Sequence, residues 1–152
     1  MNLALKNMAL PPMLSKGLTG RFVTEELMPK EIIHTDNAPK SLAYSQAVKA
    51  NGFVFVAGQG PFDAKTGDVV GTTIQEQTRQ CLRNVEAILI AASSSLDKVV
   101  SATFILGDES DFAGMNEEWV KWFPKDSPAR QGNKLPIRLK GMKISIAVIA
   151  EA

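Results

Sequence analysis

Apolar residues recur at helical spacing in two stretches of the chain. After Thr73-Ile74-Gln75-Glu76, which has the Thr-x-x-Glu pattern of a capping box, they repeat every three or four positions: Leu82, Val85, Ile88, Leu89 and Ala92. We predict a helix here that ends at Ser93-Ser94-Ser95. A second helix is predicted after Ser110 or Asp111, which can cap a face formed by Phe112, Met115, Trp119 and Trp122.

Short β-prone runs occupy much of the remaining chain. Strands are predicted at residues 32–33, 44–48, 53–57, 99–106 and 142–150. Asn51-Gly52 stands between the second and third of these runs, and Asn-Gly in that position is a strong hairpin signal. In the last run Ile144, Ile146 and Val148 share one face, because side chains alternate along a strand.

A further extended run follows Pro128 and contains Arg130. A turn at Leu139-Lys140-Gly141 separates it from the last strand, so we predict that the two strands form a hairpin. That pairing would place Ser145 near Arg130 or Gly132.

The order strand, hairpin, helix, strand, helix, hairpin predicts an α+β fold with two helices packed on one face of a mixed sheet. At 152 residues the chain fits one domain, which we place at residues 28–152 after an extension at residues 1–27. Two helices cover only one face of so apolar a sheet, so we expect the chain to associate with copies of itself.

Composition and charge narrow the classes of function. The chain is 45% hydrophobic and 22% charged with a net charge of +1, which indicates a globular protein and gives no overall attraction to nucleic acid or membrane. One cysteine, Cys81, and one histidine, His34, exclude a disulfide within the chain and a Cys/His zinc site. Cys81 lies in a helical pattern and is interpreted as a packing residue.

The first 27 residues differ from the rest. They contain Lys6, Lys16 and Arg21 and no acidic residue before Glu25, a pattern compatible with an organelle transit peptide. Alternatively, Met28 is the start, since residues 28–34 read as the entry to a strand. The segment has no apolar run long enough for a secretory signal or membrane span. We therefore expect a cytoplasmic protein, or a mitochondrial or plastid one if this segment is a transit peptide.

Arg130 is the main candidate for binding chemistry. Ala129 precedes it and Gly132 follows, so small neighbours would leave the guanidinium uncovered. A guanidinium can bind a carboxylate or phosphate through two parallel hydrogen bonds, and we interpret Arg130 as an anion-binding group on a strand edge. The simpler alternative is a strand arginine that faces solvent.

Other polar groups have ordinary structural interpretations. Asp108, Glu109 and Asp111 stand where helix caps and solvated loops place carboxylates, which we favour over a metal site. Tyr44 is interpreted as half-buried packing. Gly58 ends a strand, where a ligand could approach the backbone, but we favour a plain turn. A basic group is better explained as a solvated edge than as an RNA site: Lys134, Arg138, Lys140 and Lys143.

Together, these stretches resemble the RidA family, also called YjgF or L-PSP proteins. The matching motifs run in order from about residue 31 to 150: Asn37-Ala38-Pro39, Tyr44-Ser45-Gln46-Ala47-Val48, Gly58-Gln59-Gly60-Pro61, Thr66-Gly67, Gln77-Thr78-Arg79-Gln80, Leu96-Asp97-Lys98-Val99-Val100, Asp111-Phe112 with Asn116, and Pro128-Ala129-Arg130. Each motif is weak singly, and together they are highly specific.

The resemblance implies a chorismate-mutase-like fold and a homotrimer with three clefts between subunits. It also implies hydrolysis of reactive 2-imino acids, such as 2-iminobutanoate and 2-iminopropanoate, and of their enamine tautomers, to 2-oxo acids and ammonia without a cofactor. Arg130 would bind the substrate carboxylate, Tyr44 would line the cleft, and Gly58 and Gly132 would offer backbone contacts. Asn116 is assigned a structural role by default.

The chain departs from the family pattern in the last strand. Deaminating members of the family carry glutamate at the position of Ser145, and often at that of Ala147; Gly132 replaces a frequent cysteine and Ala57 a frequent serine. Serine is no useful base at neutral pH, although its hydroxyl can hold a water, and a positioned acid-base group contributes about 10²- to 10⁴-fold.

Three functions follow from these residues. The first is a weakened deaminase that uses Arg130, Tyr44 and Ser145. The second is a trimeric protein that binds small carboxylates without catalysis. The third is the endoribonuclease or translation-inhibitor activity attached to the family name, which ranks last because the chain lacks a histidine pair and a clear basic groove. Nucleic acid and membrane are not expected as partners.

Overall fold

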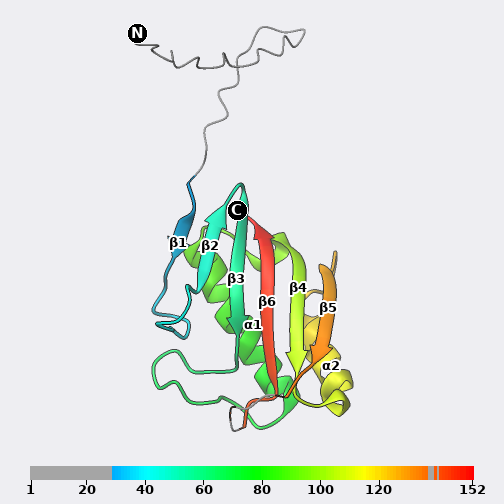
Figure 1. Ribbon diagram of the computed structural model, residues 1–152. Coiled ribbons are helices and arrows are strands. Elements are labelled where there is room, and N and C mark those ends of the chain that lie inside the picture. The colour runs from blue at the N-terminus through cyan, green and yellow to red at the C-terminus, as the bar shows by residue number, and fades with distance from the viewer. Residues whose placement is uncertain (1–28, 137–138, 140) are drawn as a thin grey trace, which may run out of the picture.

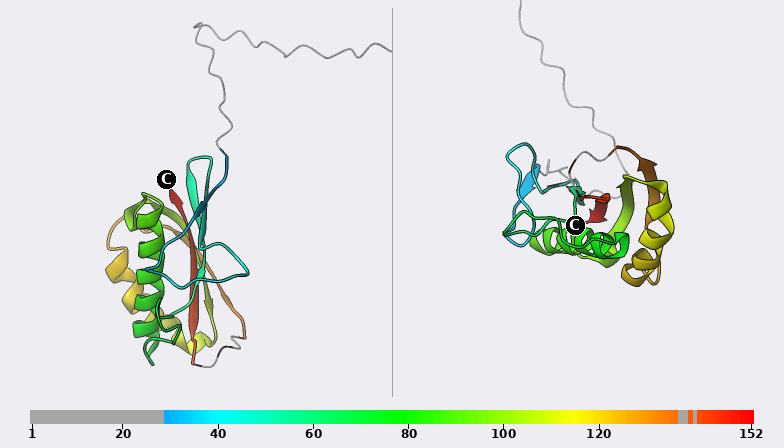
Figure 2. Two further views of the ribbon diagram at one scale, coloured as in Figure 1. Left: turned by 90° about the vertical axis from the view of Figure 1, so that its left-hand side faces the viewer. Right: turned by 90° about the horizontal axis from the view of Figure 1, so that it is seen from below.

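Six strands and two helices form the fold (Figure 1). The structure is a computed structural model that describes residues 29–136, 139 and 141–152. Its elements are β1 (Glu31–Ile33), β2 (Ala47–Ala50), β3 (Phe53–Gln59), α1 (Ile74–Ala91), η1 (Leu96–Lys98), β4 (Val99–Leu106), η2 (Glu109–Asp111), α2 (Phe112–Trp122), β5 (Ala129–Lys134) and β6 (Ile144–Glu151). The sheet order is β1-β2-β3-β6-β4-β5, and both helices lie on one face of it (Figure 2). The predicted α+β fold is confirmed.

The β2–β3 hairpin forms at the predicted turn. Its register runs from Ala47↔Val56 to Ala50↔Phe53. Asn51 and Gly52 both have positive φ, 49° and 79°, as a type I′ turn requires. Strand β2 begins at Ala47, three residues later than the pattern predicted.

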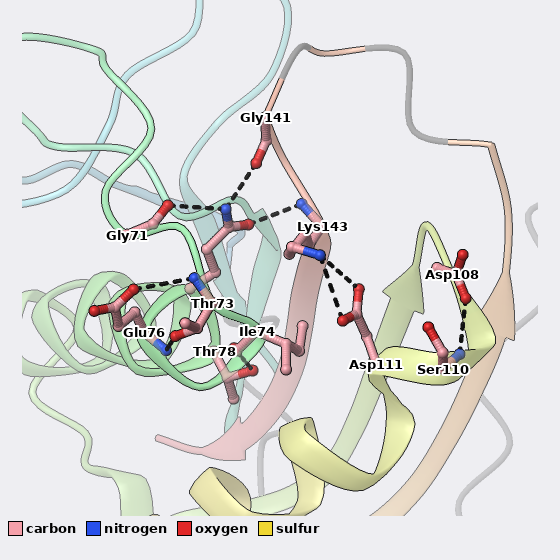
Figure 3. A network of polar contacts seen from close by, with 11 residues as sticks. Gly71, Thr73, Ile74, Glu76, Thr78, Asp108, Ser110, Asp111, Gly141 and Lys143 are labelled. Atoms are coloured by element: carbon pink, nitrogen blue, oxygen red, sulfur yellow. Dashed lines mark hydrogen bonds and ion pairs between the residues drawn. The ribbon is translucent and has the colours of Figure 1, made fainter.

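Helix α1 begins with the predicted capping box. The Thr73 hydroxyl accepts a hydrogen bond from the Glu76 backbone at 3.2 Å, and the Glu76 carboxylate accepts one from the Thr73 backbone at 3.0 Å (Figure 3). The helix ends at Ala91, and Ser93 takes the left-handed conformation (φ 61°) that glycine adopts more easily.

The predicted hairpin between β5 and β6 is wrong. Strand β5 pairs in parallel with β4, and β6 lies in the centre of the sheet, antiparallel to both β3 and β4. After β4 the chain crosses over through α2, and a crossover of this kind returns it parallel to β4. Apolar or small residues on both faces suit β6 to a central position, whereas the polar β5 suits an edge.

The start of α2 is not capped by Ser110 or Asp111. The Asp108 carboxylate caps η2 by accepting from the Ser110 backbone at 2.8 Å, and the Asp111 carboxylate instead pairs with Lys143 at 3.2 Å (Figure 3). The interpretation of Asp108 as a cap is thus confirmed. The Asp111–Lys143 pair joins the start of α2 to the segment that enters β6.

A buried amide fixes the other side of that segment. The Gln77 side chain, fully buried on α1, donates hydrogen bonds to the carbonyls of Gly71 at 3.1 Å and Gly141 at 2.7 Å. It also accepts one from the Lys143 backbone at 2.8 Å. These bonds satisfy backbone groups in a connection that has no regular structure, and they set where β6 begins (Figure 3).

The hydrophobic core lies between the helices and the sheet (Figure 2). Residues on the helix side of β6, such as Ile144 and Ile146, are completely buried. Phe53, Phe55 and Val100 are about two-fifths exposed. In the described part of the chain no helix is both long enough and apolar enough to cross a membrane.

Candidate functional site

Arg130 lies in the gap between the edge strand β5 and helix α2. It pairs in register with Ala102, so its side chain projects from the same face as the helices. One terminal nitrogen, Nη2, donates a 2.7 Å hydrogen bond to Oδ1 of Asn116, and Cζ lies 4.9 Å from the centre of the Trp119 ring. Cζ also lies 5.1 Å from the ring centre of Phe104. Nη1 also donates to the sulfur of Met115 at 3.8 Å, so the guanidinium is held by one amide, one thioether and two aromatic rings.

This arrangement corrects the expectation of an uncovered guanidinium. Small neighbours on β5 do leave space, but α2 fills part of it, and Arg130 is half-buried. Among the described residues no carboxylate forms an ion pair with Arg130. Burial lowers the pKa of Arg130 from its ordinary value, and the group remains a cation at neutral pH. A half-buried cation without a counterion favours an anionic ligand.

Asn116 gains a specific role from this geometry. Its amide oxygen accepts from the guanidinium without neutralising it, whereas an aspartate at the same place would. A guanidinium has five N–H donors, and Asn116 occupies one of them. The assigned structural role of Asn116 therefore includes the orientation of Arg130.

Gly132 is required by the ring of Phe104. A Cβ at Gly132 would lie 2.0 Å from Cζ of that ring, which is far inside van der Waals contact. The ring packs directly over the β5 backbone, two residues after Arg130 and on the same face. Gly132 thus serves Phe104 packing in addition to any contact with a ligand.

Tyr44 lies on the loop before β2, near the opposite edge of the sheet. It is 57% exposed, so the interpretation as half-buried packing is wrong. The buried amide of Gln46 shapes this loop by donating to the carbonyls of Thr35, Ala38 and Pro39. The loop borders a hollow of about 300 Å³ that is lined by His34, Lys40, Ser41, Leu42, Tyr44 and Gln46. Tyr44 is therefore available for contacts.

Ser145 and Gly58 lie together on the helix-free face. Ser145 stands between the buried Ile144 and Ile146 on β6, so it projects from the opposite face. Its Oγ is 3.0 Å from the place where a Cβ on Gly58 would be, so a side chain there would crowd the hydroxyl. The prediction that Ser145 lies near Arg130 or Gly132 is wrong within one chain, because they project from opposite faces of the sheet.

The candidate residues thus occupy three places in one chain. Arg130 and Gly132 lie at the β5 edge, Ser145 and Gly58 on the helix-free face, and Tyr44 beyond β2. Strands β2 and β5 are four strand spacings apart in the sheet order, roughly 19 Å. One small ligand cannot touch Tyr44 and Arg130 of the same chain.

The other ionisable groups of the described residues have structural roles. Throughout the described ranges no group of three or more histidine, cysteine, aspartate or glutamate residues is placed to hold a metal ion. Cys81 is buried, and desolvation raises the pKa of its thiol far above the ordinary value, which confirms the packing interpretation. The basic group is partly neutralised, since Lys134 pairs with Glu109 and Lys143 with Asp111; Arg138 and Lys140 lie outside the described residues.

These features define an α+β protein with an arginine at the edge of a mixed sheet that forms no ion pair with a carboxylate of the described residues. A family model described as endoribonuclease L-PSP matches residues 35–152. The chain belongs to this family, the RidA or YjgF family.

Its relatives include proteins from archaea, plants and bacteria. A RutC family protein of Pyrococcus horikoshii is 48% identical over 122 residues, which is 80% of this chain and 97% of the relative. The chloroplastic Reactive Intermediate Deaminase A of Arabidopsis thaliana is 38% identical over 141 residues, 92% of this chain and 73% of the relative. Among solved structures, E. coli TdcF with bound serine superposes with a TM-score of 0.75 at 32% identity, covering 80% of this chain and 98% of TdcF.

Sequence reasoning missed the aromatic and amide groups around Arg130. Phe104 stood inside a run interpreted as a central strand, and Trp119 in a face interpreted as core. The useful signal was Gly132, because a glycine inside a strand often marks the close approach of another group. Here that group is the ring of Phe104.

Proposed function

We propose that this protein hydrolyses 2-imino acids and their enamine tautomers to 2-oxo acids and ammonia. The observation that carries the proposal is the half-buried guanidinium of Arg130, which no described carboxylate neutralises. A planar carboxylate can accept two parallel hydrogen bonds from such a group. The name of the Arabidopsis relative and the serine bound to TdcF, itself an amino acid with a carboxylate, support the same assignment.

The chemistry requires water to add to the imine carbon. The proton that water loses, or another from solvent, must reach the nitrogen before the carbon–nitrogen bond breaks and ammonia leaves. Arg130 would hold the carboxylate, while the Ser145 hydroxyl beside Gly58 of a neighbouring copy would hold the water. With serine in place of a carboxylate base, we expect a rate gain smaller by about 10²- to 10⁴-fold than with a positioned acid-base group.

A complete site of this kind requires more than one copy of the chain. Tyr44 and Arg130 lie near opposite edges of the sheet, so a second copy would have to bring its Tyr44 to Arg130. Phe53, Phe55 and Val100 offer apolar surface for such an assembly. A homotrimer with clefts between subunits is the assembly we propose.

One observation favours a second function, the binding of small carboxylates without catalysis. Ser145 occupies the position at which the resemblance implies the glutamate that activates water. The Arg130 site would still select small acids, since a hydrogen bond to a charged group contributes about 1.5 to 3 kcal/mol. No observation favours the ribonuclease function, because the described lysines of the basic group pair with carboxylates.

An assay with 2-iminobutanoate generated in situ distinguishes the two functions. The rate of 2-oxobutanoate formation is compared with buffer for wild type, Arg130→Ala and Ser145→Glu, with Arg83→Ala as the control because Arg83 is exposed on α1. The deaminase proposal expects wild type and Arg83→Ala to exceed buffer and Arg130→Ala not to. If wild type only equals buffer while Ser145→Glu exceeds it, the binding function replaces the deaminase.

The compartment is also a proposal. The cytoplasm is our expectation, with mitochondrion or plastid as the alternative, and the Arabidopsis relative is chloroplastic. Residues 1–27 lie outside the described part of the chain. Fusion of these residues to a fluorescent reporter tests the point: import into an organelle would establish a transit peptide, and diffuse fluorescence would exclude one.

A further inference from the structure

An apolar hollow lies beside Arg130, between the ends of β4 and β5 and the start of α2. Its volume is about 320 Å³, and it is lined by Phe104, Leu106, Glu109, Phe112, Gly132, Asn133 and Lys134. The apolar part consists of two phenylalanine rings and a leucine. Glu109 and Lys134 pair with each other at 3.2 Å, so neither charge is left unpaired in the hollow.

The ring of Phe104 joins this hollow to the guanidinium. Its centre lies 5.1 Å from Cζ of Arg130 and 6.0 Å from the centre of the Phe112 ring. Along β5, Arg130 and Gly132 project from the same face and are separated by roughly 7 Å. Phe104 touches the guanidinium and also lines the hollow, so a ligand held by Arg130 lies next to the hollow.

Phe112 is unusual for an apolar residue at this place. It is 46% exposed although it touches the buried ring of Phe104. Apolar rings close to a cation match the common form of a ligand site, in which apolar walls surround a few polar groups. Here Phe104 links the two, since it touches both Phe112 and Arg130. Gly132 keeps the hollow open, because a side chain there would displace the Phe104 ring.

We infer that the hollow binds the side chain of the substrate, and that the substrate is a 2-imino acid with a branched aliphatic or aromatic side chain. This inference rests on the proposed function, because binding of the substrate carboxylate to Arg130 determines where the substrate side chain lies. The apolar walls select against polar side chains, which would lose hydrogen bonds to water there. A side chain of one or two carbons would leave most of the hollow unfilled.

Binding of stable 2-oxo acids tests the inference without catalysis. Calorimetric titration of the full-length protein with 2-oxobutanoate, 4-methyl-2-oxopentanoate and phenylpyruvate gives three affinities. We expect wild type to bind the two larger acids at least tenfold more tightly than 2-oxobutanoate, since a buried methylene contributes roughly fourfold.

One variant and a control locate the effect. Phe112→Ala should weaken phenylpyruvate binding about tenfold and leave 2-oxobutanoate binding unchanged. Val120→Ala removes another exposed apolar side chain from α2, 60% exposed, and should change neither affinity. Circular dichroism checks that both proteins stay folded.

The outcomes separate this inference from the proposed function. Equal affinities for the three acids, all lost in Arg130→Ala, would overturn the hollow as a side-chain site and leave the acid site intact. An equal loss of affinity for all three acids in Phe112→Ala would also overturn it, because the ring would then not contact the side chain of the ligand specifically. Absence of binding for every acid in wild type would overturn the acid site itself and, with it, this inference.

Discussion

Glu118 joins the two helices, and its replacement gives a quantitative prediction. This buried carboxylate on α2 accepts hydrogen bonds from Nε and Nη2 of Arg79 on α1, each at 2.9 Å. Lys121 and Trp122 each donate a further bond at 3.1 Å. The hydrogen bonds from Arg79 are the main reason that the pKa of Glu118 falls from 4.5 to about 2.

The magnitude follows from that lowered pKa. A fall from 4.5 to about 2 corresponds to about 3 kcal/mol of folding free energy at neutral pH. The Arg79 side chain is 39% exposed, so solvent screens the pair and we expect about 2 kcal/mol for Glu118→Gln. Because the pKa is lower in the folded state, this contribution is complete above pH 4.5. It is lost as the pH falls from 4.5 toward 2.

Urea unfolding at several pH values measures this difference. The matched control is Glu117→Gln, since Glu117 is the neighbouring residue, is exposed, and accepts a bond from the neutral Gln75. At pH 7, Glu118→Gln should be less stable than wild type by about 2 kcal/mol, and Glu117→Gln by less than about 0.5. The gap for Glu118→Gln should shrink below pH 4.5. Equal stability of the two variants at pH 7, or a gap unchanged at pH 2.5, would refute the reasoning.

Three further predictions concern local structure. Thr73→Ala removes the cap of α1 and should lower the free energy of unfolding by about 1 kcal/mol, measured by urea titration; no change would contradict the capping role. Gly52→Ala places a Cβ at φ 79° and should cost about 1 kcal/mol in the same assay, whereas equal stability would mean that the turn relaxes. Cys81 should react with a thiol reagent only after unfolding, and rapid labelling of the native protein would contradict its buried, neutral state.

The features that the sequence predicted well are local. The capping box and the Asn51-Gly52 turn depend on residues within a few positions of each other, and both form as expected. The pairing of β5 and β6 depends on contacts across the sheet, and there the predicted turn at Leu139-Lys140-Gly141 favoured the wrong hairpin. The residues of β5 are polar on both faces, which indicates an edge strand. Those of β6 are mostly apolar on both faces, which indicates a central strand.

In the candidate site, too, the residue type could be predicted from the sequence, whereas its long-range contacts could not. The choice of Arg130 as the anion-binding candidate could be made from its residue type and from the family resemblance. Its enclosure by Asn116, Phe104 and Trp119 could not, because it depends on how the crossover helix α2 lies over the edge strand. The separation of Ser145 from Arg130 could not be predicted either, because it depends on the order of the strands in the sheet and on which face each side chain occupies.

The most direct test of the central claim gives Arg130 a counterion within the chain. Asn116→Asp places a carboxylate where an oxygen now lies 2.7 Å from Nη2, with almost no change in shape. If Arg130 binds substrate because it lacks such a partner, the affinity for 2-oxobutanoate should fall by about tenfold or more relative to wild type, while the protein stays folded. Equal affinity of wild type and Asn116→Asp would contradict the account.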